Sequence, residues 1–231
     1  FLPKEISRAN LFTYVESELK AIESGLSAAR TADYGHVEQP AAWALLARMY
    51  LNAAVYTGTA RYTDAITYAK KVVDAGYGLQ TGYFKLFMAD NDKYRNEIIW
   101  AINCDGLRGQ AYGNTTFLIH APAGGDYADF GASGGWFGYR ATKALGAKFP
   151  KDASGSIDTT KDVRGKAFYT SAFKGTDAQG NINTMADISD FSTGYHVKKY
   201  VNKRSDGGSV SDPTTTYADI DFPIFRLPEM Y

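Results

Sequence analysis

The sequence has very little cysteine and no excess of charge. Its 231 residues include a single cysteine, Cys104, which excludes a disulfide within the chain and any cysteine-based metal cluster. Lys and Arg together number 25, and so do Asp and Glu, so no overall field attracts nucleic acid or an anionic membrane. No apolar run reaches the roughly 20 residues that cross a bilayer. The composition therefore fits a neutral ligand at least as well as a charged one.

Two motifs of common enzyme classes are also absent. The sequence contains no phosphate-binding glycine loop and no H-E-x-x-H helix. Its three histidines, His36, His120 and His196, are scattered and lack metal-ligand spacing. We therefore expect no enzyme. A glycoside hydrolase stays open as an alternative, because its two carboxylates meet in space and cannot be read from spacing.

Aromatic residues, by contrast, are plentiful. The chain has 17 Tyr, 13 Phe and 3 Trp, and several lie in polar, glycine-rich sequence where a hydrophobic core would not need them. Flat amphipathic rings in loops suit carbohydrate or peptide surfaces. Trp43 and Trp100 lie instead in apolar periodic runs, and we expect both to pack inside.

The region before residue 80 is predicted to be helical. Helices are expected over residues 8–26, with Ser7 as N-cap, over 40–56 and over 62–75, ended by Gly76. The second has the spacing of the first helix of a tetratricopeptide (TPR) unit, carried by Trp43, Leu46, Ala47 and Tyr50. The third has its own apolar face, made of Tyr62, Ala65, Tyr68, Ala69 and Val72. Such a hairpin cannot bury its apolar stripe alone, which implies a stacked helical body.

Residues 81–231 are predicted to be loop-rich. Strands are expected within 97–106 and 194–203, and a short helix over 139–149, with Leu145 and Phe149 facing inward. Residues 107–138 read as loop, and 151–162 and 175–190 as surface loops. The predicted fold class is mainly α, with TPR-like hairpins supporting an irregular region with a few short strands. We expect one incomplete domain, helical over 1–80 and loop-rich over 81–231.

Many short pieces, in order along nearly the whole chain, resemble the SusD/RagB family of surface glycan-binding lipoproteins of Bacteroidetes polysaccharide-utilisation systems. Among these pieces are YGHVEQPAAWALLARMYLNAAVYTG, AYGNTTFLIHA, GWFGYRA and RLPEMY. The sequence resembles above all the family's starch-binding founding member. The resemblance implies non-catalytic capture of starch or a malto-oligosaccharide, an α-1,4-glucan, at the bacterial surface.

The resemblance also implies a cellular setting. Family members sit over a SusC-like TonB-dependent transporter on the extracellular face of the outer membrane and pass the glycan on for import. A lipid anchor holds them there. Cys104 lies mid-chain and cannot carry that anchor, so the lipidated cysteine would precede Phe1. We therefore expect this chain to be an internal fragment of a longer protein, with no nucleic-acid partner.

Two rings of the family's binding arc correspond to Tyr112 and Trp136 in this sequence, while a third would precede Phe1. Each ring lies beside glycine, where flexible backbone can present it outward. A ring lying against the apolar face of a sugar should contribute about 1 kcal/mol. The alternative is that both rings only pin the loop to the body. Candidates for bonding sugar hydroxyls are Asn114, Asp129 and Arg140.

A cation site is a further expectation. The stretch MADND places Asp90, Asn91 and Asp92 together, and oxygen ligands suit Ca²⁺. Nothing like a twelve-residue calcium loop follows. The resemblance makes Asp92 a candidate calcium ligand, although glycan binding requires no cofactor. A plain turn and helix cap is the alternative.

Two other binding functions remain open from the sequence. A TPR adaptor for peptides would carry Lys, Arg and Asn on its concave helix faces, whereas these helices carry Tyr and Ala. A SusD-like protein for a different glycan fits the same residues, because no short motif specifies the sugar.

Overall fold

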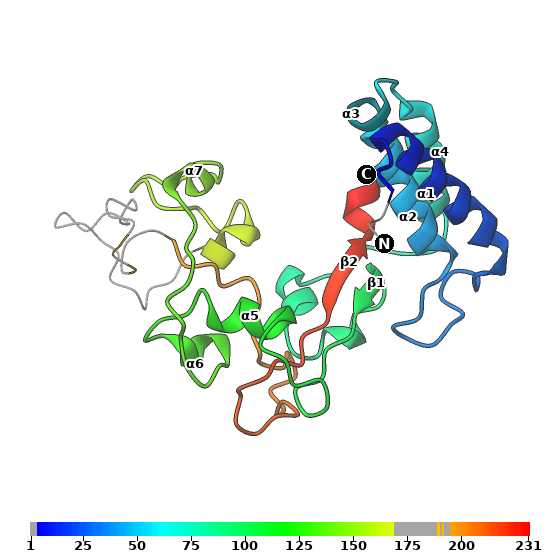
Figure 1. Ribbon diagram of the computed structural model, residues 1–231. Helices are drawn as coiled ribbons and strands as arrows, with labels where there is room; N and C mark the ends of the chain where they lie inside the picture. The colour runs from blue at the N-terminus through cyan, green and yellow to red at the C-terminus, as the bar shows by residue number, and fades with distance from the viewer. Residues whose placement is uncertain (1–3, 169–188, 190, 192–194) are drawn as a thin grey trace. The chain divides into compact units, whose positions relative to one another are not determined.

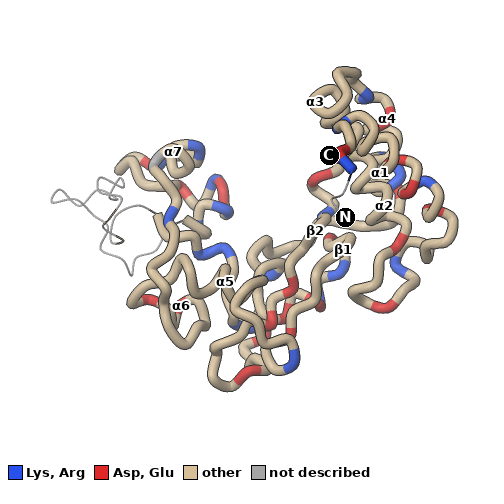
Figure 2. The backbone as a smooth tube through the Cα atoms, in the orientation of Figure 1, with Lys and Arg blue, Asp and Glu red and all other residues tan. Residues whose placement is uncertain are grey.

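The computed structural model describes residues 4–168, 189, 191 and 195–231 (Figure 1). It is mostly helical, with two short strands among the described residues. The chain forms two compact units. We call residues 4–80, 95–102 and 223–231 the helical unit, and the remaining described residues the loop-rich unit. Figure 2 shows basic and acidic residues interspersed along both. None of the helices that the structure describes has the length and apolarity needed to span a bilayer.

The helical unit contains four α-helices: α1 (Arg8–Ile22), α2 (Gln39–Leu51), α3 (Ala53–Thr57) and α4 (Tyr62–Val73). Ser7 caps α1 by accepting a hydrogen bond from the Asn10 backbone N–H at 3.2 Å, as predicted. α2 and α4 pack along each other, which confirms the helical hairpin. Asn52 separates α2 from α3 where one helix was expected, and Gly76 adopts φ +83° two residues after the α4 cap.

The hairpin is held by the residues that predicted it. Leu46 and Tyr50 of α2 are fully buried, and they form a cluster with Phe12 of α1 and Ala65 of α4. A second cluster joins the hairpin to β1 (Ile98–Ile102), which pairs with β2 (Phe222–Arg226). Trp43 and Trp100 pack against this cluster, as expected. A 3-10 turn (Glu23–Gly25) follows α1, and another (Leu227–Met230) follows β2.

The loop-rich unit contains three short helices: α5 (Asn114–His120), α6 (Tyr127–Phe130) and α7 (Lys143–Gly146). Its 3-10 turns span Tyr83–Phe87, Asn91–Lys93 and Val163–Phe168. The core is small and gathers mainly alanine around three large side chains, Ile119, Phe130 and Ile220. With so little apolar volume, the unit depends on side-chain hydrogen bonds to backbone for much of its order.

Asp90 and Asn91 of the MADND stretch make such hydrogen bonds within the unit. Asp90 is fully buried, and its carboxylate accepts hydrogen bonds from the backbone N–H and the hydroxyl of Ser205, both at 2.8 Å. Asn91, also buried, donates to the carbonyls of Leu86 and Asp221 and accepts from the Asp221 N–H. The turn interpretation of this stretch is therefore confirmed for Asp90 and Asn91.

Several predicted elements differ from the structure. The 107–138 region is not all loop, because α5 and α6 lie in it. The strand expected over 194–203 is wrong: its described residues form only isolated bridges at Tyr195 and Val201, and Tyr195 and His196 are both buried instead of alternating. α7 is shorter than predicted, and Leu145 is exposed. Residues 175–190 lie outside the described residues except for Ser189.

Candidate functional site

Five aromatic rings lie edge by edge on the loop-rich unit. We call them the aromatic row, and in spatial order they are Tyr217, Tyr112, Trp136, Phe117 and Tyr139. Successive ring centroids are 5.3, 6.1, 6.1 and 6.0 Å apart. The first three pairs are tilted by 46°, 54° and 58°, so the rings do not form one flat plane. The row is a continuous, faceted surface that crosses three separate chain segments.

The central rings face solvent. Tyr112 is 60% exposed, Trp136 40% and Phe117 46%, values far above those of core aromatics. A large exposed apolar side chain in isolation is ordinary, but several in contact mark a binding surface. The expectation that Tyr112 and Trp136 lie outward and together is met in the geometry of this unit.

The turn before Trp136 is held tightly against the end of α5. The Trp136 N–H donates to the His120 carbonyl at 2.9 Å, and the Gly138 N–H to the Ala121 carbonyl at 2.7 Å. Gly135 approaches the 123–124 backbone so closely that a Cβ there would lie 2.2 Å from the Gly124 carbonyl oxygen. Only glycine fits this approach. The indole is therefore fixed by backbone contacts as well as by its neighbours in the row.

The segment that carries Tyr217 is organised by one buried carboxylate. Asp212 accepts the backbone N–H groups of Thr214, Thr216 and Tyr217, each at 2.9 Å. Burial alone would raise the pKa of Asp212, but these hydrogen bonds outweigh it and lower the pKa below its ordinary value. The carboxylate thus stays charged and holds the turn.

α5 ties this segment to the rest of the row. Two buried threonines of the helix bond the 218–220 backbone: Thr115 donates to the Ile220 carbonyl at 2.6 Å, and Thr116 accepts the Ala218 N–H at 3.0 Å. A hydrogen bond with Tyr112 raises the pKa of Tyr217, so the Tyr217 phenol stays protonated at neutral pH. A neutral, hydroxyl-bearing aromatic surface results.

The other predicted site residues lie in different surroundings. Asn114 begins α5 two residues after Tyr112, with a left-handed φ of 49°, and its side-chain oxygen accepts the Thr116 N–H at 2.9 Å. Asp129 of α6 pairs with Lys198 at 3.6 Å, and the Arg140 guanidinium lies 5.3 Å from the Phe191 ring centre. The structure thus places Asn114 beside the row, whereas Asp129 pairs with Lys198 and Arg140 lies against Phe191.

Sequence reasoning missed Phe117, Tyr139 and Tyr217 as parts of this surface. Phe117 lies one helical turn before His120 on α5. The sequence predicts a loop in this region, so no helical periodicity indicates that the Phe117 side chain is exposed. Tyr217 lies about a hundred residues further along the chain. The threonine hydrogen bonds described above bring its segment to α5, and the sequence does not show them. A run of threonines (Thr214–Thr216) before a tyrosine is too common to predict it.

Asp92 is exposed and precedes Lys93 in the chain. Lys93 pairs with Asp206 at 2.6 Å, and Arg204 pairs with the same carboxylate at 2.7 Å. The hydrogen bond to Asp206 raises the pKa of Arg204, with smaller contributions from the charges of Asp90 and Asp92. Within the described ranges, no group of three or more His, Cys, Asp or Glu side chains gathers as a metal site. These surroundings do not fit a calcium ion, so we derive no role for the metal, and the Asp92 ligand stays a prediction.

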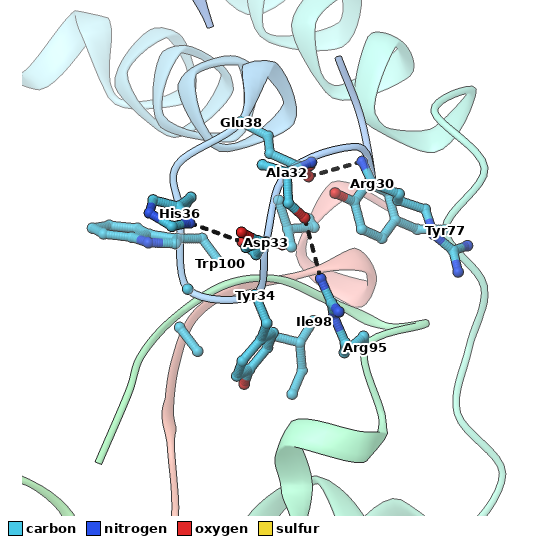
Figure 3. A pocket seen from close by; sticks show the side chains of 13 residues that line it. Arg30, Ala32, Asp33, Tyr34, His36, Glu38, Tyr77, Arg95, Ile98 and Trp100 are labelled. Atoms are coloured by element: carbon cyan, nitrogen blue, oxygen red, sulfur yellow. Dashed lines mark hydrogen bonds between the residues drawn. The ribbon is translucent and has the colours of Figure 1, made fainter. Parts of the chain in front are cut away.

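The helical unit encloses a cavity of about 260 Å³ between the 30–38 loop and β1 (Figure 3). Glu38 is buried beneath the loop, and its two oxygens accept the N–H groups of Arg30 at 2.8 Å and Ala32 at 2.7 Å. Arg95 reaches back toward the Ala32 carbonyl, and the His36 ring toward the Asp33 carbonyl. The polar groups around this cavity therefore serve to hold the loop that encloses it.

Comparison with known proteins supports the resemblance. No family model matches the chain. Over its whole length, however, the chain is 35% identical to the starch-binding protein SusD of Bacteroides thetaiotaomicron. The chain is SusD-like. It covers 47% of that SusD protein, so it spans about half the length of this relative.

Solved structures support the same fold. The SusD-like chain matches a SusD superfamily protein of Parabacteroides distasonis with a TM-score of 0.62 at 20% identity, covering 93% of this chain and 42% of that one. It matches surface glycan-binding protein A of Bacteroides thetaiotaomicron with a TM-score of 0.63 at 18% identity, covering 96% and 47%. A laminarin-binding SusD-like protein gives 0.58 at 16% identity, covering 95% and 48%. At these identities the likeness concerns the fold alone.

Proposed function

We propose that this SusD-like chain is part of a non-catalytic protein that captures starch or a malto-oligosaccharide at the cell surface. The observation that carries the proposal is the outward, contiguous placement of Tyr112 and Trp136 in the aromatic row. The apolar C–H faces of pyranose rings can lie against such rings while the hydroxyl-rich edges stay in water.

The tilt between the rings favours a curved ligand. Interplanar angles of 46° to 58° along Tyr217, Tyr112, Trp136 and Phe117 turn the surface step by step. An α-1,4-glucan is helical, whereas a β-1,4-glucan is straight, so a faceted row contacts more of the former. The starch-binding relative supports this choice. The laminarin-binding relative makes a different glycan the second candidate.

The affinity of one such row should be modest. At about 1 kcal/mol for each ring, four rings correspond to about 4 kcal/mol, a dissociation constant of about 1 mM. A polymer that engages several molecules on one surface gains avidity from the repeated contacts. This suits a protein that holds a long glycan before import.

We further infer the setting in which the full-length protein acts. The α2–α4 hairpin serves as one TPR-like unit of a longer helical body. The partner is a SusC-like TonB-dependent transporter, and a lipid anchor upstream of Phe1 holds the protein on the extracellular face of the outer membrane. Asn114, Asp129 and Arg140 supply hydrogen bonds to sugar hydroxyls, with Asn114 placed best for it.

The test is affinity electrophoresis of the full-length protein in gels containing amylopectin, pullulan, dextran, xylan or laminarin. We expect retardation by amylopectin and pullulan, and about a fivefold loss of affinity in Trp136→Ala, since truncation removes one ring that contributes about 1 kcal/mol. Tyr112→Ala should behave similarly. Tyr62→Ala is the matched control, because Tyr62 is 56% exposed but lies on α4.

Each result separates the alternatives. Retardation by laminarin or xylan alone would replace starch with that glycan. Release of reducing sugar from soluble starch would indicate a hydrolase instead. Equal retardation of wild type and Trp136→Ala would remove the aromatic row from the explanation.

A further inference from the structure

His120 lies directly beneath the aromatic row. It is the last residue of α5, its side chain is 2% exposed, and its ring stacks on the Trp136 indole at 4.8 Å between centroids and 17° between planes. Its backbone carbonyl also accepts the Trp136 N–H. The residue therefore supports the central ring from below through both its backbone and its side chain.

Both nitrogens of the His120 ring face carbonyl oxygens. Nδ1 lies 2.6 Å from the Gly134 oxygen, and Nε2 lies 2.9 Å from the Thr216 oxygen. Gly134 precedes Trp136 by two residues, and Thr216 immediately precedes Tyr217. One imidazole thus joins the three segments that present the row: α5 itself, the turn before Trp136 and the turn before Tyr217.

The chemistry of this arrangement distinguishes the two protonation states. A carbonyl oxygen can only accept, and a neutral imidazole has one N–H, whereas the imidazolium has two. Only the protonated ring can donate to both carbonyls. The neutral ring must direct a nitrogen lone pair at one of them. The protonated ring also gains a cation–π contact with the indole stacked on it.

We propose that His120 is a positioning residue for glycan binding, and that its protonated form fixes Trp136 and Tyr217 in the binding arrangement. This rests on the proposed function of the row. The neutral ring leaves one of the two turns without its hydrogen bond from the imidazole. Affinity for the glycan is then higher with the protonated ring than with the neutral one.

The positive charge of the protonated His120 ring is met by the two carbonyl oxygens and not by the ionisable groups around it. On the 212–217 segment, the Asp212 carboxylate is occupied by backbone N–H groups, and Tyr217 is a phenol. Asp126 accepts a hydrogen bond from the Gly124 N–H and pairs with His196. The flanking segments also carry the ionisable side chains of Tyr112, Tyr139 and Arg140. In the part of the chain that the structure describes, no carboxylate forms an ion pair with His120.

The first test measures glycan affinity of the full-length protein from about pH 5.5 to about pH 8. We expect wild-type affinity for malto-oligosaccharide to be about fivefold to tenfold higher at the acidic end of this range than at the alkaline end. His120→Gln, which lacks the imidazole ring and carries no charge at any pH in this range, should bind about tenfold more weakly without this pH dependence. His36→Gln, an exposed histidine of the helical unit, should keep the wild-type profile.

The second test needs no glycan. A protonated imidazole stacked on an indole quenches its fluorescence, so the emission contributed by Trp136, taken as wild type minus Trp136→Phe, should fall on acidification. This pH response should vanish in His120→Gln. If that variant does not fold, the wild-type emission and affinity profiles decide the question by themselves.

The outcomes separate the two proposals. Binding that depends on Trp136 but not on His120 or pH would overturn the positioning role and leave the glycan proposal standing. Absence of binding to every glycan would overturn the glycan proposal, and with it the link to binding. Trp136 emission that does not change with pH would contradict the stacking of a protonated His120 ring on Trp136.

Discussion

At the scale of single residues, two neighbouring glycines differ in the space that surrounds a Cβ atom at each position. A Cβ on Gly135 would meet the Gly124 and Ala123 carbonyl oxygens at 2.2 and 2.7 Å, whereas nothing lies within 4 Å of a Cβ on Gly134. The obstacles at Gly135 are backbone atoms, which cannot move aside as the end of a flexible side chain can. The turn before Trp136 therefore tolerates a methyl group at one position and not at the next.

This difference gives a matched pair of variants. Gly135→Ala should push the Trp136 turn away from α5 and reduce amylopectin retardation to nearly that of Trp136→Ala. It should also destabilise the protein by about 1–3 kcal/mol, the usual cost of overpacking. Gly134→Ala should bind like wild type. The measurement is affinity electrophoresis together with urea unfolding, and similar behaviour of the two variants would contradict the geometry described here.

Sequence could identify the rings but not what lies beneath them. Tyr112 and Trp136 stand out because each is an aromatic residue beside glycine in a polar stretch. His120 does not stand out in the sequence, because its contacts are to Gly134 and Thr216 and follow no regular spacing. Contacts of this kind depend on tertiary structure alone.

At the scale of elements, α1 is tied to the hairpin by one acidic residue. Glu16 of α1 accepts the Tyr50 hydroxyl at 2.7 Å, bonds Lys20 at 2.7 Å and lies 3.3 Å from the Arg61 guanidinium. Burial opposes the charge, but the hydrogen bonds from these three residues outweigh it and lower the pKa of Glu16 to about 2. The charged form is thus favoured by folding.

The lowered pKa sets the pH range in which Glu16 stabilises the fold. A carboxyl with a folded pKa of about 2 and an ordinary value of 4.5 contributes stability above pH 4.5, and the contribution is lost as pH falls toward 2. Glu16→Gln should lower the free energy of unfolding by about 1–2 kcal/mol at pH 7. The difference from wild type should shrink near pH 2.5, as checked by urea unfolding. Glu18→Gln, exposed on the same helix, should have little effect at either pH.

The elements divide into those that periodicity could predict and those it could not. α2 and α4 carry apolar residues at helical spacing, and Leu46, Tyr50, Ala65 and Val72 are buried as expected. Tyr62, expected on the same buried face of α4, is 56% exposed instead. α5 was missed because it is seven residues long and buries Thr115, Thr116 and His120 with Ile119. Its stability comes from hydrogen bonds to distant backbone, which no local pattern records. The false strand near Tyr195 shows the converse, since the alternating residues there form only isolated bridges within the described part of the chain.

At the scale of the whole molecule, charge balance predicts how binding responds to salt. The 25 basic and 25 acidic residues cancel, and the row itself consists of neutral rings. Contacts between apolar ring faces and sugar are not screened by ions, unlike exposed charge pairs. We therefore expect the affinity for malto-oligosaccharide to change less than about twofold between about 0.05 M and about 0.5 M NaCl. Isothermal titration calorimetry would check this, and a steep salt dependence would point to an ionic ligand instead.

The aromatic row takes its rings from α5 and the residues just before it, from the turn at Gly135 and from the turn that Asp212 organises. Each segment can exchange its ring without disturbing the alanine-rich interior behind it, because none of the five rings belongs to that interior. Descendants of one ancestral scaffold could thus acquire new sugar preferences by altering a single turn, in small heritable steps, while the supporting architecture is inherited unchanged.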